Sequence, residues 1–379
     1  MKFLLAPDKF RGSLTAEEVC SAMAEGIRAV LPAADIIMLP MADGGEGTAE
    51  ILTFDARGTM LTTTVADPLG RSIEAAYGIS ADGATAFIEM ASASGLRLLE
   101  SDERNPCLTS TFGTGQLILE AVRQGANHIV LGIGGSATTD AGIGMAAALG
   151  WQFWDAEGQP LEPNGENLIK IHKIVRPASS PKIHVEVACD VTAPLYGFGG
   201  AAQLYAPQKG ATPEMVTQLD KGLKHLADLI KKDFGLDLAH VPGAGAAGGL
   251  GFGALFFLGA TLKEGVKIVM EQTHFAEKLE GVNWIFTGEG KIDEQTLQGK
   301  LIAGIANAAH LKGIPVVALC GALLVSPDDI RRIGLTYATS IINRPMTLDE
   351  AIASAYTGVK DASQQLTQLF CKISNVDKV

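Results

Sequence analysis

The chain has 379 residues, 47% of them hydrophobic and 19% charged, so it can bury a large core and is long enough for two or three domains. Its net charge of −12 at pH 7 argues against a surface for nucleic acid or anionic lipid, since both would be repelled. The longest apolar run, residues 250–262, is shorter than the roughly 20 residues that a membrane-spanning helix needs.

Two features of the sequence favour the cytoplasm. The five cysteines are an odd number, are widely spaced and form no C-x-x-C pair, which is typical of a reducing compartment. The N-terminus becomes polar at Asp8, too early for a signal peptide. We therefore expect a cytoplasmic protein that binds neither nucleic acid nor membrane, and the sequence leaves open whether it forms a homo-oligomer.

The first part of the chain alternates between strand and helix patterns. Apolar residues 3–6 predict a strand, and the capping box Thr15-Ala16-Glu17-Glu18 predicts the start of a helix. Residues 36–40 predict a second strand, and a second helix is expected from Thr48 onward. Alternation of this kind predicts a parallel sheet.

The pattern changes after about residue 60. Apolar and polar residues alternate over 61–65, 73–79 and 85–90, and turn residues separate the three runs, so we expect an antiparallel meander. Mixed character then continues to about residue 282. It includes strands at 129–133 and 183–188, and a long helix that begins at Thr212-Pro213.

The strand–helix rhythm returns from Trp284. Strands are expected at 284–287, 316–320 and 338–342, and a last helix from the capping box Thr347–Glu350. The sequence therefore predicts an α/β protein with two α/β domains and a cleft between them. One is a Rossmann-like parallel-sheet domain built from both chain ends (1–62 plus 283–379), and the other is an inserted mixed-sheet domain (63–282).

Glycines and acids follow nearly every predicted strand, where open parallel sheets bind their ligands. Backbone N–H groups of glycine-rich loops bind anions such as phosphate. A carboxylate beside them would repel phosphate unless a cation such as Mg²⁺ lay between. The combination favours nucleotide-dependent phosphoryl transfer. These segments are residues 7–9, 41–48, 132–140, 189–192 and 288–293.

Other phosphate and metal motifs are absent or weak. No P-loop or protein-kinase motif occurs, and the histidines lack the H-x-x-x-H spacing of a zinc site. Residues 243–248 match a dinucleotide fingerprint but follow a poor strand, whereas residues 132–137 follow a strand but precede an acid. Residues 134–138 lack the final glycine of a hydrolase elbow.

The loops resemble the bacterial glycerate kinase family, class I, of the glycerate 2-kinase type. The resemblance runs in order over essentially the whole chain and is carried by residues 6–14, 42–48, 134–140, 189–192, 243–249 and 287–293. Its most specific parts are Asp-Gly-Gly-Glu-Gly-Thr at 43–48 and Gly-Gly-Ser-Ala-Thr at 134–138. The resemblance implies a phosphotransferase that uses ATP and Mg²⁺ to phosphorylate D-glycerate to 2-phosphoglycerate in the interdomain cleft.

Site roles follow from what a glycerate kinase needs. We assign Asp190, Asp293 and Lys9 as catalytic, with Asp190 and Asp293 also as metal ligands, because the sequence cannot separate a base from a metal ligand. For Arg71, the competing interpretation is that it is only a structural residue of a turn. Substrate binding is assigned to Asp8, Arg11, Arg71 and Ser136, and ATP binding to Asp43, Gly44, Gly45, Glu46, Gly47, Thr48, Gly134 and Gly135.

Two functions of other classes remain open from the residues alone. The same loops could belong to a sensor that binds a sugar acid without turnover, or to an NAD-dependent oxidoreductase that uses residues 132–137. The residues also leave open which hydroxyl is phosphorylated and which related hydroxy acids are accepted.

Overall fold

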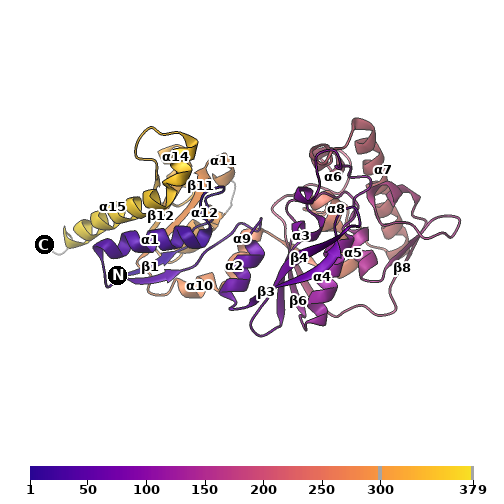
Figure 1. Ribbon diagram of the computed structural model, residues 1–379, viewed down its shortest axis with the longest axis horizontal. Coiled ribbons are helices and arrows are strands. Elements are labelled where there is room, and N and C mark those ends of the chain that lie inside the picture. The colour runs from indigo at the N-terminus through magenta and orange to yellow at the C-terminus, as the bar shows by residue number, and fades with distance from the viewer. Residues whose placement is uncertain (298–300, 377–379) are drawn as a thin grey trace. The chain divides into compact units, whose positions relative to one another are not determined.

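The computed structural model describes residues 1–297 and 301–376, and their contacts divide the chain into two compact units. Unit 1 consists of Met1–Asp43 and Val269–Val379, and unit 2 of Gly44–Ile268. Unit 1 therefore combines the indigo and the yellow ends of the chain in Figure 1. The expected α/β class, with one part built from both chain ends, is confirmed.

In the described part of unit 1, five parallel strands form one sheet in the order β13-β12-β11-β1-β2. The central pair joins the two ends of the chain, since Phe3 lies opposite Trp284 in register. The strands are β1 (Lys2–Leu5), β2 (Asp35–Met38), β11 (Trp284–Ile292), β12 (Val316–Leu323) and β13 (Tyr337–Ser340).

Helices α1 (Ala16–Val30) and α15 (Ala355–Val376) lie side by side and share a core with alternate residues of the sheet, among them Phe3 and Phe286. A Cβ on Gly26 of α1 would lie 2.2 Å from the Lys360 carbonyl oxygen, so this position requires glycine. Helix α12 (Leu301–His310) contacts β11 and β12. The remaining helices of unit 1 are α10 (Phe275–Lys278), α11 (Glu294–Leu297), α13 (Pro327–Arg332) and α14 (Leu348–Ala353), and α9 (Gly265–Gln272) crosses the boundary between the units.

Unit 2 holds a mixed sheet that, among the residues described, has six strands in the order β10-β9-β6-β5-β4-β3. The expected antiparallel meander is confirmed, because β4 pairs with both β3 and β5 in antiparallel register. The other pairs are parallel. The strands are β3 (Thr59–Ala66), β4 (Ser72–Ile79), β5 (Thr85–Glu89), β6 (His128–Gly132), β9 (His184–Ala188) and β10 (Thr261–Lys263).

A large apolar core covers one face of this sheet. It includes alternate residues of β6 and β9, such as Ile129 and Val185, together with the buried sides of the helices. Strands β7 (Gln152–Trp154) and β8 (Lys173–Val175) pair in antiparallel register and form a separate two-stranded sheet. The α-helices of this unit are α2 (Thr48–Asp55), α3 (Ala91–Ser94), α4 (Phe112–Arg123), α5 (Ile143–Ala148), α6 (Ala201–Tyr205), α7 (Pro213–Phe234) and α8 (Ala246–Gly253).

The units divide at 43/44 and 268/269, whereas the sequence placed the crossings near 62 and 282. The difference at the first crossing is α2, which contacts β4 and β5 of unit 2 rather than the parallel sheet. At the second crossing, residues 269–282 lie in unit 1, ahead of β11. The connection between the units therefore runs through the loop before α2 and through α9.

Two expected elements were wrong in detail. The strand from Trp284 does not end at Thr287, because β11 pairs with β12 as far as Ile292 opposite Leu323. Residues 288–292 are therefore strand and not loop. The last helix is two helices, α14 and α15, since α14 ends at Ala353.

None of the helices in residues 1–297 and 301–376 is long and apolar enough to cross a membrane.

Candidate active site

An acidic group lies at the carboxyl edge of the unit 1 sheet. Asp8 follows β1, Asp43 follows the neighbouring strand β2, and Glu289 lies on β11, the neighbour of β1 on its other side. Burial raises the pKa of Asp8 to about 7, and the charges of Asp43 and Glu289 add to this shift. The backbone N–H of Lys9 donates to the Asp8 carboxylate at 2.7 Å, and this hydrogen bond lowers the pKa and so opposes part of the shift. Asp8 is therefore a carboxyl group that exchanges its proton near neutral pH.

Neighbouring residues hold this edge in place. The Asp8 N–H donates to the Gly288 carbonyl at 2.8 Å, and the Thr296 hydroxyl donates to Glu289 at 2.6 Å. A Cβ on Gly290 would lie 3.3 Å from the backbone nitrogen of Arg11, so strand β11 passes close to the loop after β1. The structure thus brings the predicted residues Asp8, Lys9 and Asp43 to one edge. It adds Glu289, whose only signal in the sequence is its place between two glycines.

Asp293 follows β11, as the sequence predicts, but its carboxylate is already engaged. Its oxygens lie 2.6 Å from the Lys291 ammonium and accept the Gln295 N–H at 2.9 Å, at the start of α11. The hydrogen bonds from Lys291 and Gln295 hold the pKa of Asp293 below its usual range. These contacts are those of a charged helix-capping residue.

The predicted phosphate loop at residues 44–48 opens α2, and an internal carboxylate occupies part of it. One oxygen of Glu89 accepts the N–H groups of Gly47 at 2.8 Å and Ala49 at 3.1 Å. Glu46 is exposed and pairs with Arg97. The start of α2 therefore binds an anionic group, as its geometry predicts, but the group belongs to the chain itself. Nothing in the sequence near residue 48 points to Glu89.

Gly44 brings two predicted site segments together within unit 2. A Cβ on Gly44 would lie 2.6 Å from the Gly265 Cα and 3.3 Å from the Ala188 Cβ. The Gly265 N–H donates to the exposed Asp190 carboxylate at 2.7 Å. Loop 44–48 and the end of β9, with Asp190, are therefore neighbours at the first turn of α9.

The second glycine loop, at residues 134–136, is held by a lysine that sequence analysis missed. Lys209 is 1% exposed, and its ammonium donates to the Ser136 hydroxyl at 2.6 Å and to the Thr138 carbonyl at 2.5 Å. Burial lowers the pKa of Lys209 to about 7, and the charge of Asp140 opposes the shift. Gly134 and Gly135 themselves are exposed. The loop thus presents backbone to solvent from a rigid support.

Asp140 ties the rest of this segment to the first turn of α5. Its carboxylate accepts the Thr111 N–H and hydroxyl at 2.8 and 2.7 Å, and the N–H groups of Gly142 and Gly144 at 3.1 and 3.2 Å. Complete burial raises its pKa, and these hydrogen bonds oppose the shift. In the described residues, the buried hydroxyls of Thr138 and Thr139 have no hydrogen-bond partner. Asp140 is therefore structural, and two polar groups beside it remain unsatisfied.

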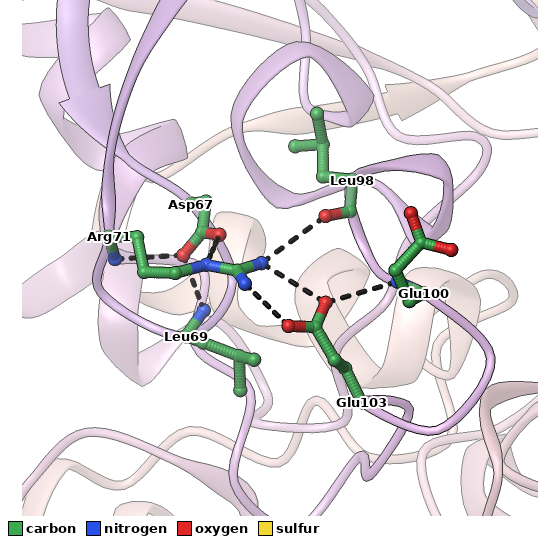
Figure 2. A network of polar contacts seen from close by, with 6 residues as sticks. All are labelled: Asp67, Leu69, Arg71, Leu98, Glu100 and Glu103. Carbon is green, nitrogen blue, oxygen red and sulfur yellow. Dashed lines mark hydrogen bonds and ion pairs between the residues drawn. The ribbon is translucent and has the colours of Figure 1, made fainter.

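Arg71 is part of a polar network, shown in Figure 2. Its guanidinium contacts Asp67 at 2.5 Å and Glu103 at 2.5 Å, and donates to the Leu98 carbonyl at 3.4 Å. The hydrogen bonds from Glu103 and Asp67 raise the pKa of Arg71 above its ordinary value. Asp67 is 2% exposed and also accepts the backbone N–H groups of Leu69 and Arg71. This arrangement supports the interpretation of Arg71 as a residue of its turn.

The two dinucleotide-like segments lack the context that such a fingerprint requires. Residues 132–137 follow β6, but no helix opens there, since α5 begins only at Ile143. Residues 243–248 lead into α8 without a strand before them. Neither segment forms the strand–turn–helix that holds a pyrophosphate.

Comparison with known proteins identifies the family. The sequence model of the glycerate kinase family matches residues 3–371. The chain is 43% identical to a glycerate kinase of Halalkalibacterium halodurans, over 96% of each chain, and 42% identical to glycerate 2-kinase of Escherichia coli K12, over 97% of each. A crystal structure described as "putative glycerate kinase 2 from Salmonella typhimurium LT2" superposes with a TM-score of 0.91 at 40% identity and covers 99% of both chains. The chain therefore belongs to the glycerate kinase family, and it is an enzyme, a kinase.

Proposed function

We propose that this kinase transfers the γ-phosphoryl group of ATP to D-glycerate with the help of Mg²⁺, and that the product is 2-phosphoglycerate. Membership of the family supports the substrate, and the relative named glycerate 2-kinase supports the position of the phosphoryl group. The observation that carries the proposal is the acidic edge of unit 1, where Asp8 has a pKa of about 7 beside Asp43 and Glu289.

The residues at this edge fit a hard divalent cation. Mg²⁺ prefers oxygen ligands, keeps several of its waters and needs only one or two carboxylates. Asp43 and Glu289 raise the pKa of Asp8 through their negative charges, and a cation would relieve that repulsion. When bound, Mg²⁺ would neutralise negative charge on the phosphoryl oxygens.

The chain's own residues supply the other roles. Asp8 accepts the proton of the glycerate hydroxyl, because its pKa of about 7 suits a base at neutral pH. Lys9 and Arg11, on the same loop, bind the glycerate carboxylate, and the arginine can do so through two parallel hydrogen bonds. Asp190 and Asp293 are further candidates for metal binding, because each is a carboxylate that follows a strand, Asp190 after β9 and Asp293 after β11.

Unit 2, considered by itself, holds two segments suited to binding phosphate. The exposed glycines at 134 and 135 offer backbone N–H groups on a loop that Lys209 supports through Ser136. Loop 44–48 offers the start of α2. Both are places where backbone N–H groups bind phosphate oxygens.

A coupled assay tests the proposal. Purified enzyme is given ATP with D-glycerate, L-glycerate or buffer, with Mg²⁺ or with excess EDTA, and ADP release is followed. We expect ADP release only with D-glycerate and Mg²⁺. The product should be consumed by enolase without added phosphoglycerate mutase, since enolase acts on 2-phosphoglycerate directly. Glycerate binding without ADP release would support the sensor instead, and a requirement for the mutase would place the phosphoryl group on the other hydroxyl.

A further inference from the structure

Two histidines and a glutamate from separate parts of the sequence gather on one face of the unit 2 sheet. β6 and β9 are parallel neighbours, and His128 lies opposite His184 in register. Glu186 is two residues beyond His184 on the same strand, so its side chain leaves the sheet on the same face. Adjacent strands and a spacing of two therefore bring three metal-ligating residues together.

The distances are those of a compact donor set. The nearest ligand atoms of His128, His184 and Glu186 all lie within 4.8 Å of one another. The His128 Nε2 is 3.0 Å from a Glu186 oxygen, and the two imidazole rings have their centres 5.1 Å apart. Ligand atoms around a tetrahedral ion with bonds of about 2.0–2.1 Å are separated by roughly 3.4 Å, so small side-chain rotations suffice.

Burial and charge prepare the set for a cation. The Glu186 side chain is 7% exposed and that of His128 is 22% exposed, whereas His184 is exposed and leaves a path from solvent. Burial opposes ionisation of Glu186, but Lys263 and His128 together hold its pKa below the ordinary value. The Lys263 ammonium lies 2.5 Å from the second Glu186 oxygen. The lysine therefore already pairs with this carboxylate and would compete with a metal ion for it.

We propose that His128, His184 and Glu186 form a site for a borderline divalent transition-metal ion such as Zn²⁺, with water completing its coordination. Two imidazole nitrogens and one carboxylate favour such an ion over Mg²⁺, which prefers oxygen. The site is separate from the segments assigned to the kinase reaction. His128 and His184 begin β6 and β9, whereas loop 134–136 and Asp190 follow the opposite ends of these strands.

A bound ion would crosslink β6 and β9 near their amino ends. Because it binds the folded chain, it would also raise the apparent stability of the protein. The sequence alone could not show the site, since His128 and His184 are distant in the chain and lie outside the H-x-x-x-H spacing expected for zinc.

Zinc titration of the full-length protein tests this proposal. The protein is stripped of metal with a chelator, dialysed and titrated with ZnCl₂ against a chromophoric competitor, and Co²⁺ is used in parallel as a spectroscopic probe. We expect one equivalent of Zn²⁺ to bind and to raise the Tm, and Co²⁺ to give the absorption of a nitrogen-ligated, low-symmetry site. Millimolar Mg²⁺ should not displace either ion.

Variants identify the ligands. His128→Ala and His184→Gln should each lose the bound equivalent, and Lys263→Met should bind Zn²⁺ more tightly, because the competing ammonium is gone. His274→Ala is the matched control. His274 lies 3.6 Å from Glu277 in an exposed pair, and among the described residues it belongs to no cluster of three possible metal ligands, so its removal should change nothing.

Absence of stoichiometric binding in the wild type would overturn the proposal. So would binding that persists in His128→Ala and in His184→Gln. Metal-free melting curves of the variants show that each is folded. His184 is exposed, so His184→Gln keeps the test valid even where His128→Ala unfolds.

Discussion

The ammonium of Lys209 donates to the hydroxyl of Ser136 at 2.6 Å, and the lysine is 1% exposed. A cation has therefore been buried beneath the glycine loop at 134–136, although burial disfavours its charge. The same ammonium donates to the Thr138 carbonyl, so one side chain fixes both ends of a short turn. Burying the Lys209 ammonium costs free energy, so we infer that the shape of the loop at 134–136 matters for function.

Lys209→Met should destabilise the protein by about 1–3 kcal/mol, because the Ser136 hydroxyl and the Thr138 carbonyl lose their buried donor. The KM for ATP should rise, since the glycine loop loses its support. Urea denaturation and initial rates measure the two effects. Lys224→Met is the control, because Lys224 is exposed and its ion pair is with the exposed Asp228. Equal stability of the two variants would contradict the supporting role of Lys209.

The titration of Asp8 predicts the pH dependence of the metal-free enzyme. Its pKa is about 7 in the folded protein and 3.8 ordinarily, so between these values the folded chain holds a proton that the unfolded chain has released. The stabilisation is therefore complete below pH 3.8 and is lost as the pH rises through about 7. Asp8→Asn should flatten this part of the profile of Tm against pH. A profile identical to that of the wild type would show that Asp8 titrates normally.

The same group predicts the pH dependence of the reaction. As a proton acceptor, Asp8 must be ionised, so kcat should rise with pH through the pKa of Asp8, which bound Mg²⁺ would bring below the value of about 7 in the metal-free protein. Asp8→Asn should lower kcat strongly while the protein stays folded. A variant that retains wild-type kcat would remove Asp8 from the reaction and leave the other carboxylates to be tested.

Asp293→Asn and Asp190→Asn should each lower kcat far more than Tm. Asparagine keeps an oxygen that can accept the N–H of Gln295 or Gly265, so little structure is lost, but the negative charge is removed. Rates at saturating Mg²⁺, together with melting curves, separate the two effects. Normal turnover in either variant would assign that acid to helix capping alone.

Arg71→Gln should lower Tm and leave the KM for glycerate within about twofold of the wild type. The reason is that the guanidinium is held by Asp67 and Glu103, and its loss leaves the buried Asp67 carboxylate without its cation. A large rise in KM with an unchanged Tm would instead restore Arg71 as the residue that binds the substrate carboxylate.

Glu89→Gln should lower the KM for ATP. Glutamine can still accept the Gly47 N–H, but the negative charge that competes with a phosphate at the start of α2 is gone. The variant should also lose some stability, because a carboxylate at this end of a helix contributes about 0.3–1 kcal/mol. An unchanged KM with a lower Tm would make this end of α2 purely structural.

Local signals predicted much of the fold. The capping boxes at Thr15 and Thr347 and the proline after Thr212 each begin a helix at the expected residue, because such caps are complete within four residues of chain. The length of β11 was missed. Glycine is disfavoured in strands, yet β12 supplies hydrogen-bond partners to Gly288 and beyond.

Less of the site could be predicted from the sequence, because it too depends on contacts between distant parts of the chain. Glycine-rich loops and acids after strands point to a place, but the residues that act on them come from elsewhere in the chain. Glu89 reaches loop 44–48, and Lys209 reaches Ser136, only through tertiary packing. No spacing in the sequence encodes such pairs, since each depends on which strands become neighbours.

The pairing of β1 with β11 has a consequence for the order in which the protein folds during synthesis. Residues 44–268 form one contiguous unit that can complete itself as soon as it leaves the ribosome, whereas β1 must wait until residues near 284 have been made. The first 43 residues therefore emerge with an apolar strand and an amphipathic helix but without the sheet that covers them, and closing so long a loop slows this step. Residues 1–43 are therefore synthesised first, but they reach their folded state only after unit 2 has folded.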